Sequence, residues 1–167
     1  SNPGNAREKA EGTVFEYLTA VQDAKLYHYR RFVNGIYVLK ARTAKSAAKM
    51  FYRFLDTVAV PEGDSEPRFN LITYCIKGEY VSIIILRKCH RSHHYFSEGP
   101  DHLTMSPGCA DMGGVFIASV REDYDKLTSE LLGEMLAEIT PSDSEQEELI
   151  ARLSRKQPQI SVGNNVR

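Results

Sequence analysis

The segment that most constrains the fold runs from residue 69 to residue 86 and reads FNLITYCIKGEYVSIIIL. It contains two runs rich in β-branched and aromatic residues, which favour strands, and the runs meet at Lys77-Gly78. The second run is apolar almost without alternation, as in a strand that is buried on both faces. The segment therefore predicts a β-hairpin whose second strand lies inside a sheet.

A second hairpin is predicted upstream, with strands at residues 25–33 and 36–41. Between them stands Asn34-Gly35, a dipeptide that accepts the positive φ angles of a two-residue hairpin turn. Residues 102–120, HLTMSPGCADMGGVFIASV, are predicted to hold two further strands around a bend rich in glycine and proline. Tight turns between successive strands imply antiparallel pairing.

Helices are predicted between and after these strands. From Thr43 the apolar residues recur at steps of three and four, as on one face of a helix, with Thr43 as its cap and Pro61 closing the segment. Residues 119–122 have the form of a capping box before an amphipathic helix that ends ahead of Pro141, and an acidic helix follows from about residue 144. The apolar face of the first helix is predicted to comprise Ala44, Ala47, Ala48, Phe51, Leu55 and Val58.

The predicted class is therefore α+β, with an antiparallel sheet built from hairpins and helices packed on it. Residues 1–24 are polar at their start and are expected to form a poorly ordered or partly structured entrance. Residues 25–140 form the α+β domain, and residues 141–167 form a short helix and a tail. The tail contains QISV, which resembles the first strand of a following domain that is missing here.

Composition limits the classes of partner. The formal net charge of −1 provides no global basic field, so a nucleic-acid partner is not expected. The longest apolar run, residues 81–86, is far shorter than the roughly 18 residues that a membrane-spanning helix needs, so no membrane partner is expected. Three cysteines without repeated spacing favour a reducing compartment over a disulfide framework, which predicts a cytoplasmic location.

A histidine-rich segment, LRKCHRSHHYF at residues 86–96, follows the buried strand. A structural zinc site usually brings paired ligands from two places, and only Cys89, His93 and His94 offer themselves as weak metal candidates, so no metal site is predicted. A catalytic histidine needs an orienting carboxylate, and Asp101 and Asp111 are near only in sequence.

Cations provide another interpretation of the same segment. Arg87, Lys88, His90 and Arg91 form a compact cluster at a strand end, and such donors suit phosphate oxygens. The alternative is a solvated strand end whose charges pair with Glu79, Glu98 or Asp101.

The segment MSPGCADMGG at residues 105–114 is a second candidate for ligand binding. Gly108 and Gly113 let the backbone approach a ligand closely, and Ser106 and Asp111 can form hydrogen bonds with it. The segment lacks the spacing of a P-loop, of a dinucleotide fingerprint and of a hydrolase elbow. A turn-rich connection between strands is an equally good interpretation.

Three segments together carry a resemblance: FNLITYCIKGEYVSIIILRKCHRSHHYF, HLTMSPGCADMGGVFIAS and REDYDKLTSELLGEML. They resemble the C-terminal half of bacterial proteins related to ATP adenylyltransferase and to the GDP-sugar phosphorylases, which are histidine-triad-like. The resemblance implies a histidine-triad-like half-fold and a nucleotide or nucleoside polyphosphate as ligand. It also implies a missing N-terminal half as a partner.

The chain departs from this family at the nucleophile. His93 and His94 are adjacent, the His-x-His-x-Gln/His motif is absent, and residues 1–24 contain no histidine. We therefore expect a fragment of a nucleotidyltransferase or nucleotide phosphorylase that contributes a phosphate-binding rim but no catalytic residue and no cofactor. The alternative is a non-catalytic module that binds a nucleotide or a protein and whose sheet is completed by a missing N-terminal half. An exposed apolar sheet face would indicate that this complement is missing.

Overall fold

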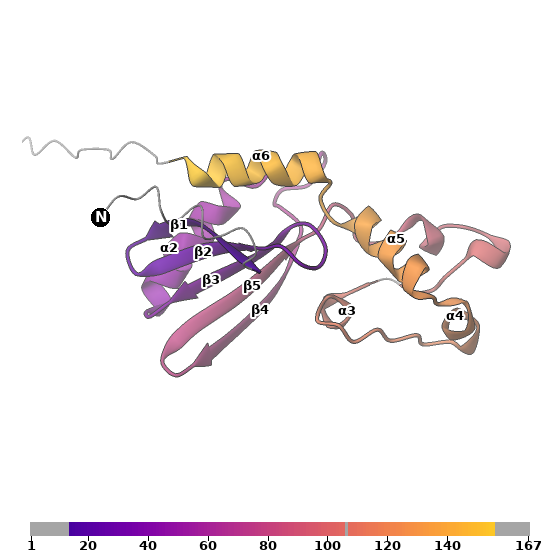
Figure 1. Ribbon diagram of the computed structural model, residues 1–167. Coiled ribbons are helices and arrows are strands. Elements are labelled where there is room, and N and C mark those ends of the chain that lie inside the picture. Colours follow the sequence, from indigo (N-terminus) through magenta and orange to yellow (C-terminus); the bar gives the residue numbers. More distant parts are fainter. Residues whose placement is uncertain (1–13, 106, 156–167) are drawn as a thin grey trace, which may run out of the picture.

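The computed structural model describes residues 14–105 and 107–155, and its centre is a five-stranded antiparallel sheet in the order β1-β2-β3-β5-β4. Helices pack on one face of this sheet and a lobe of short helices lies at one end (Figure 1). The predicted α+β class with an antiparallel sheet is thus confirmed. The strands are β1 (Phe15–Val21), β2 (Ala24–Tyr29), β3 (Ile36–Ala41), β4 (Phe69–Ile76) and β5 (Glu79–Leu86).

The hairpin of β4 and β5 is as predicted. Its turn consists of Lys77 and Gly78, both with positive φ, at 51° and 77°, as in the two-residue turns that match the twist of paired strands. β5 lies between β3 and β4 in the sheet and is buried along most of its length.

The hairpin of β2 and β3 is correct as a pairing but its predicted turn is wrong. The register pairs His28 with Tyr37, so residues 30–35 form a longer connection. Gly35 has a positive φ of 79°, but its role is to allow a contact with a residue distant in the sequence and not to form a two-residue turn. A Cβ at this position would lie 2.7 Å from Cδ of Pro141, so only glycine allows that close approach.

Strand β1 and helix α6 (Asp143–Ser154) extend the sheet and its core beyond residues 25–140 on both sides. β1 pairs with β2 and carries an irregularity between Tyr17 and Thr19. Helix α6 begins at Ser142 in a capping box with Glu145. The QISV segment of the tail lies outside the described residues.

Helix α2 (Ala44–Leu55) begins where predicted, since the Thr43 hydroxyl accepts a hydrogen bond from Ser46 N at 3.2 Å. Its predicted apolar face is partly wrong, because Ala44 and Ala48 are exposed. The buried stripe is Ser46, Met50 and Phe54, with Ala47, Phe51, Leu55 and Val58 packed beside the core.

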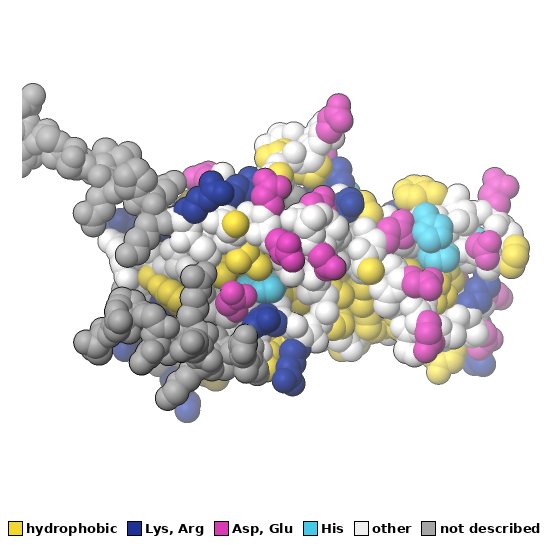
Figure 2. All heavy atoms as spheres, turned by 45° about the horizontal axis from the view of Figure 1, so that its top comes forward, with side chains coloured by type: hydrophobic (Ala, Val, Ile, Leu, Met, Phe, Trp, Pro, Cys, Tyr) yellow, Lys and Arg dark blue, Asp and Glu magenta, His cyan; other side chains and the backbone are white. Residues whose placement is uncertain are grey.

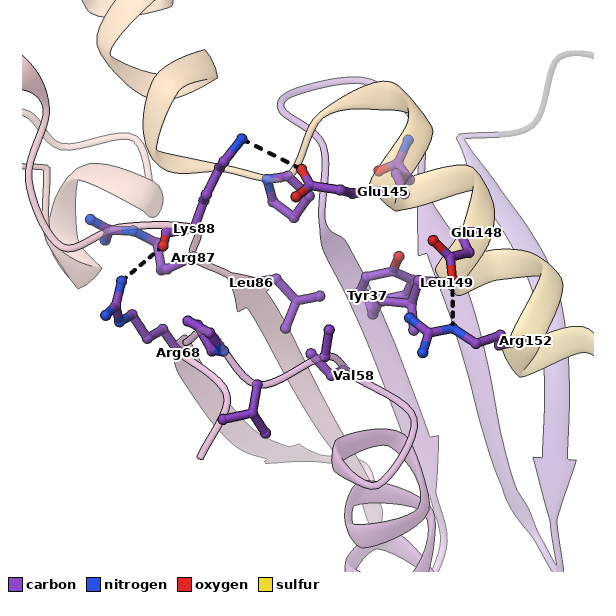
Figure 3. Close-up of a pocket in the computed structure, with 15 residues that line it drawn as sticks. Tyr37, Val58, Arg68, Leu86, Arg87, Lys88, Glu145, Glu148, Leu149 and Arg152 are labelled. Carbon is purple, nitrogen blue, oxygen red and sulfur yellow. Dashed lines mark hydrogen bonds and ion pairs between the residues drawn. The ribbon is translucent and has the colours of Figure 1, made fainter. Parts of the chain in front are cut away.

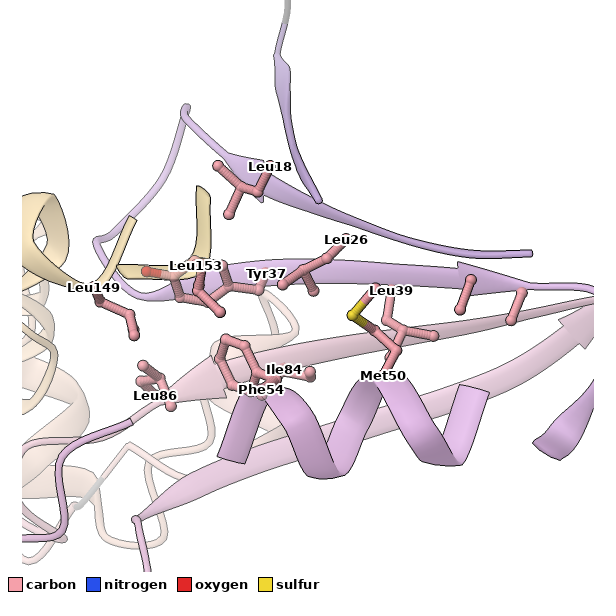
Figure 4. Packing of buried hydrophobic residues seen from close by; sticks show 12 residues of the cluster. Leu18, Leu26, Tyr37, Leu39, Met50, Phe54, Ile84, Leu86, Leu149 and Leu153 are labelled. Carbon is pink, nitrogen blue, oxygen red and sulfur yellow. The ribbon is translucent and has the colours of Figure 1, made fainter. Parts of the chain in front are cut away.

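The main core lies between the sheet and helices α2 and α6 (Figure 4). Tyr37 of β3 meets Phe54 of α2 with ring centroids 5.0 Å apart. Burial of such side chains contributes about 1.5–3 kcal/mol each. The largest contributors from the sheet and the two helices are Leu26, Tyr37, Leu39, Met50, Phe54, Ile84, Leu86, Leu149 and Leu153.

The lobe, residues 89–105 and 107–139, contains no strand among its described residues, so the two strands predicted within 102–120 are wrong. Asp111 explains the difference, because its carboxylate accepts a hydrogen bond from Gly108 N at 2.6 Å and stabilises the start of a short helix. The capping box predicted at 119–122 is also absent, with Val120 as the cap. The lobe comprises η1 (His93–Tyr95), η2 (Gly99–Asp101), α3 (Cys109–Met112), α4 (Arg121–Lys126) and α5 (Ser129–Ile139).

Candidate ligand cavity beneath helix α6

Arg87, the first of the predicted phosphate-binding residues, is buried at the end of β5, with 8% of its surface exposed. Its guanidinium donates to Asn70 Oδ1 and to the His90 carbonyl, both at 2.9 Å. Burial lowers the pKa of Arg87, and the charges of Cys89 and Asp111 oppose that shift. Arg87 therefore ties β5 to β4 and to the loop that follows.

The adjacent residues His93 and His94 connect segments of the lobe through hydrogen bonds. His93 Nδ1 lies 2.9 Å from Oε2 of Glu138 on α5, and the His93 backbone N–H donates to the other oxygen at 2.8 Å. His94 Nδ1 lies 3.2 Å from the Asp101 carbonyl, and the two imidazole rings stack with centroids 3.9 Å apart. Figure 2 shows histidine side chains together on the lobe with carboxylates nearby. The carboxylate partner of His93 is thus Glu138, and not Asp101 or Asp111, which were the two carboxylates considered from the sequence.

The weak metal candidates do not converge on one point. The Cys89 thiol donates to the Arg91 carbonyl at 3.2 Å and lies 3.9 Å from the Glu138 carbonyl. Within residues 14–105 and 107–155, no three His, Cys, Asp or Glu side chains are grouped as ligands of a metal ion would be.

Lys88 and Arg91, two further cations of the predicted rim, have different side-chain partners. Lys88 N donates to the Ile139 carbonyl at 2.8 Å, while its ammonium lies 3.8 Å from Glu145 on α6. The Arg91 guanidinium stacks 3.6 Å above the Tyr95 ring. The His90 carbonyl is held by Arg87. The side chains of Arg87, Lys88 and Arg91 therefore have separate protein partners.

The glycine-rich segment also belongs to the architecture of the lobe. Asp111 is buried and accepts from Gly108 N and from Ile117 N, the latter at 3.3 Å. Gly113 ends α3 and donates to the Cys109 carbonyl at 3.1 Å. Ser106 lies outside the described residues.

A cavity of about 340 Å³ lies instead between α6, the end of β5 and residues 58–61 (Figure 3). Its walls are largely apolar, with Val58, Leu86 and Leu149 among them. Arg87 and Lys88 are the predicted site residues that line it, and the Arg87 side chain points away from Tyr37 and Leu149. His90, Arg91, Gly108, Asp111 and Gly113 do not line it.

Two cations stand at opposite ends of this cavity, Lys88 near Glu145 and Arg152 near Glu148 (Figure 3). Both ion pairs are long, at 3.8 and 3.9 Å. Glu145 is already engaged, because it accepts from the hydroxyl and the backbone N–H of Ser142 at 2.7 and 2.8 Å. These hydrogen bonds, more than the charge of Lys88, lower the pKa of Glu145. Lys88 and Arg152 are therefore held loosely enough to meet a ligand.

A third cation, Arg68, also lines the cavity, and protein groups hold both ends of its guanidinium. Its Nη2 donates to Asp64 Oδ1 at 3.1 Å within an ion pair that brings Nε to 2.6 Å from Oδ2, and its Nη1 donates to the Lys88 carbonyl at 2.9 Å. Arg68 thus fixes the backbone of Lys88 at the cavity and leaves ligand contact to the other two cations.

Tyr37 adds a polar group to the apolar wall. Its side chain is fully buried, and its hydroxyl has no hydrogen-bond partner in the part of the chain that the structure describes. Burial raises the pKa of Tyr37, so the phenol stays neutral and can both donate and accept. A buried hydroxyl without a partner beside a cavity is a group that a ligand can satisfy.

Sequence reasoning missed Tyr37 and Arg152. Arg152 stands between Leu149 and Leu153 in the acidic helix, and that spacing indicates a residue at the border of the buried helical face. The sequence around Tyr37 does not indicate that its hydroxyl lies at a cavity lined by α6, because Tyr37 and α6 are distant in sequence.

Comparison of the chain with protein-family models, with curated proteins and with solved structures finds no match. Among the helices of the described residues, none has the length and apolar character needed to cross a membrane.

Proposed function

We propose that this chain is a non-catalytic binding module that holds a nucleotide or another phosphate-bearing small molecule in the cavity beneath α6. The observation that carries the proposal is the pair of loosely held cations, Lys88 and Arg152, at the ends of an apolar cavity. The buried Tyr37 hydroxyl supports it as a further hydrogen-bonding group.

Size and chemistry agree with such a ligand. The cavity volume of about 340 Å³ falls in the range of roughly 300–1,000 Å³ typical of small-molecule sites. Lysine and arginine make charge-assisted hydrogen bonds to phosphate oxygens, while Leu86 and Leu149 offer an apolar surface to a base. Of the cations predicted at the strand end, the proposal therefore keeps Lys88 as a phosphate ligand and adds Arg152.

The absence of catalysis is part of the proposal. His93 is paired with Glu138 on the lobe, and His94 is held by the Asp101 carbonyl, so neither histidine is offered as a nucleophile to a ligand beneath α6. In the wider proposal the chain contributes this cavity to a histidine-triad-like nucleotidyltransferase whose nucleophile lies elsewhere. We propose a cytoplasmic location, which the free thiols of all three cysteines support.

Isothermal titration calorimetry with ADP and ATP tests the proposal on the wild-type chain and three variants. Lys88→Ala and Arg152→Ala should each weaken binding about tenfold, since an exposed charge-assisted contact contributes about 1–1.5 kcal/mol. Arg91→Ala is the matched control, because Arg91 is a neighbouring cation that stacks on Tyr95 outside the cavity. An absence of binding heat, or an Arg91→Ala loss equal to that of Lys88→Ala, contradicts the proposal.

A further inference from the structure

Strand β4 ends the sheet on one side, with no other strand along its outer edge among the described residues (Figure 1). An edge strand leaves backbone groups unpaired, and proteins usually protect it with a charged side chain, a proline or an irregularity. Strand β1, at the other edge, has Glu16 and the irregularity between Tyr17 and Thr19. Residues 69–76 of β4 contain no charged residue, proline or glycine, and they pair with β5 without a shift of register. β4 is therefore the unprotected edge of the sheet.

The register of the β4–β5 hairpin determines which backbone groups of β4 point outward. Arg87 N donates to the Arg68 carbonyl at 2.9 Å, and opposite residues in an antiparallel pair alternate between hydrogen-bonded and non-hydrogen-bonded pairs. Along the register from Arg68, the even-numbered residues of β4 are therefore the ones that bond to β5. The odd-numbered residues direct their N–H and C=O groups away from the sheet: Phe69, Leu71, Thr73 and Cys75.

Apolar side chains are exposed on both faces of β4. Leu71 lies opposite the buried Ile84 on the face that carries α2, and it is 41% exposed. Tyr74 and Ile76, on the other face by alternation, are 45 and 53% exposed. An extended strand laid along β4 would bond its outward backbone groups and cover these side chains. None of residues 69–76 lines the cavity beneath α6, so this edge is independent of the proposed function.

Opposite charges flank β4. The segment before it, residues 61–68, carries three carboxylates and one arginine, and Arg68 is paired with one of the carboxylates. The other two, Glu62 and Glu66, have no ion-pair partner among the described residues. Lys77, directly after β4, is exposed and is likewise unpaired within that part of the chain. Antiparallel pairing of β4 with an identical strand places each Lys77 beside the acidic segment of the other copy, so the flanking charges favour a second copy of this chain.

We infer that β4 pairs with β4 of a second copy, antiparallel and about a two-fold axis that passes through Ile72 perpendicular to the sheet. Leu71 then lies opposite the partner's Thr73, and Phe69 lies opposite the partner's Cys75. All the outward backbone groups bond, which gives about eight hydrogen bonds and joins the two five-stranded sheets into one. An axis through Thr73 would leave the outward groups of Phe69 without a strand partner, so the axis through Ile72 is favoured.

This register also determines the contacts of the charged ends. Lys77 of each copy stands beside residues 65–67 of its partner, which include Glu66. Glu79, the nearest carboxylate along the chain, begins β5, which lies one strand further from the partner. The symmetric dimer therefore contains two Lys77–Glu66 contacts, one at each end of the paired strands.

Sedimentation equilibrium over about a hundredfold range of concentration tests the pairing, because association follows mass action. The wild type should approach twice its monomer mass of 18.9 kDa. Leu71→Pro should remain monomeric, since proline removes an outward N–H that β5 does not use and its ring obstructs a partner strand. Leu71→Ala is the matched control, which keeps the N–H and should dimerise within about threefold of wild type. Circular dichroism should show that both variants keep the wild-type fold.

Disulfide cross-linking tests the register in a background without native thiols, made by Cys75→Ser, Cys89→Ser and Cys109→Ser. Ile72→Cys should give a disulfide-linked dimer under mild oxidation, because residues opposite each other in a non-hydrogen-bonded pair have Cα atoms about 4.5 Å apart. Tyr74→Cys is the matched control on the same face, and it should give none, since its copies are displaced by four residues, about 13 Å.

Charge reversal tests the contact that favours a second copy. Lys77→Glu and Glu66→Lys should each weaken the dimer about three- to tenfold, and the double variant should restore it. A wild-type monomer at every concentration, or a Leu71→Pro variant that dimerises like wild type, overturns the pairing and leaves this edge to a strand of another protein. Faster cross-linking by Thr73→Cys than by Ile72→Cys overturns the axis. Failure of the double variant to restore the dimer overturns the Lys77–Glu66 contact.

Discussion

Arg87 is a buried guanidinium whose two direct hydrogen bonds end on neutral oxygens, those of Asn70 and the His90 carbonyl. Arg87→Ala removes both bonds and leaves their acceptors in a buried setting. We expect a loss of about 2–3 kcal/mol in the free energy of unfolding. Urea denaturation measures it, with Arg91→Ala as the exposed control, which should lose no more than about 1 kcal/mol.

An opposite pattern would contradict this role for Arg87. If Arg87→Ala kept wild-type stability but lost nucleotide binding, Arg87 would be the phosphate ligand that its place in the sequence suggested. The sequence could predict that a cation stands here, but its orientation depends on Asn70, seventeen residues away on the neighbouring strand.

The charge of Glu148 should weaken the binding of a phosphate. Glu148 is the exposed carboxylate 3.9 Å from Arg152 at one end of the cavity, so it opposes an incoming phosphate. Glu148→Gln should tighten ADP binding about two- to fivefold, an effect that salt diminishes. Glu147→Gln makes the same charge change on the same helix, at an exposed position outside the cavity, and should leave the affinity unchanged. Weaker binding by Glu148→Gln would favour a cationic ligand.

At the scale of elements, α6 depends on the hydrogen bonds between Ser142 and Glu145. These bonds, with Lys88 adding a smaller effect, hold the pKa of Glu145 below its ordinary value of 4.5. A carboxyl whose pKa is lowered by folding stabilises the protein above the unfolded pKa, and that stabilisation is lost as the pH falls through the folded pKa. Glu145→Ala should therefore cost about 1 kcal/mol at neutral pH.

Urea denaturation of wild type and Glu145→Ala across the acid range measures this dependence. The difference in unfolding free energy should be constant above about pH 4.5 and shrink as the pH falls further. A difference that persists undiminished in acid would show that packing of the side chain, and not its charge, stabilises α6.

Elements with a local signal were predicted well. The Lys77-Gly78 hairpin and the Thr43 start of α2 each depend on residues adjacent in sequence. β1 was missed because the irregularity between Tyr17 and Thr19 breaks the period of two. Gly35 was assigned to a hairpin turn because its actual neighbour, Pro141, is more than a hundred residues away.

At the scale of the whole molecule, the sheet separates two surfaces with different chemistry. One face carries α2, α6 and the mixed cavity with Lys88 and Arg152. The other face has a depression lined by aromatic and aliphatic side chains, among them Phe15, Tyr74 and Ile83, together with Lys40. Neither surface could be predicted as a site, because each joins strands, helices and loops that only the tertiary fold brings together.

The proposed ligand binds beneath α6 and not at the histidine-rich loop. Backbone amide chemical shifts, recorded by ¹H–¹⁵N NMR during titration with ADP, test it most directly. The largest changes should fall on the cavity-lining residues of β5 and α6, which are Leu86, Arg87, Lys88, Glu145, Gln146, Glu148, Leu149 and Arg152. Changes concentrated at residues 90–94 and 108–113 would contradict it and restore the strand-end rim as the binding site.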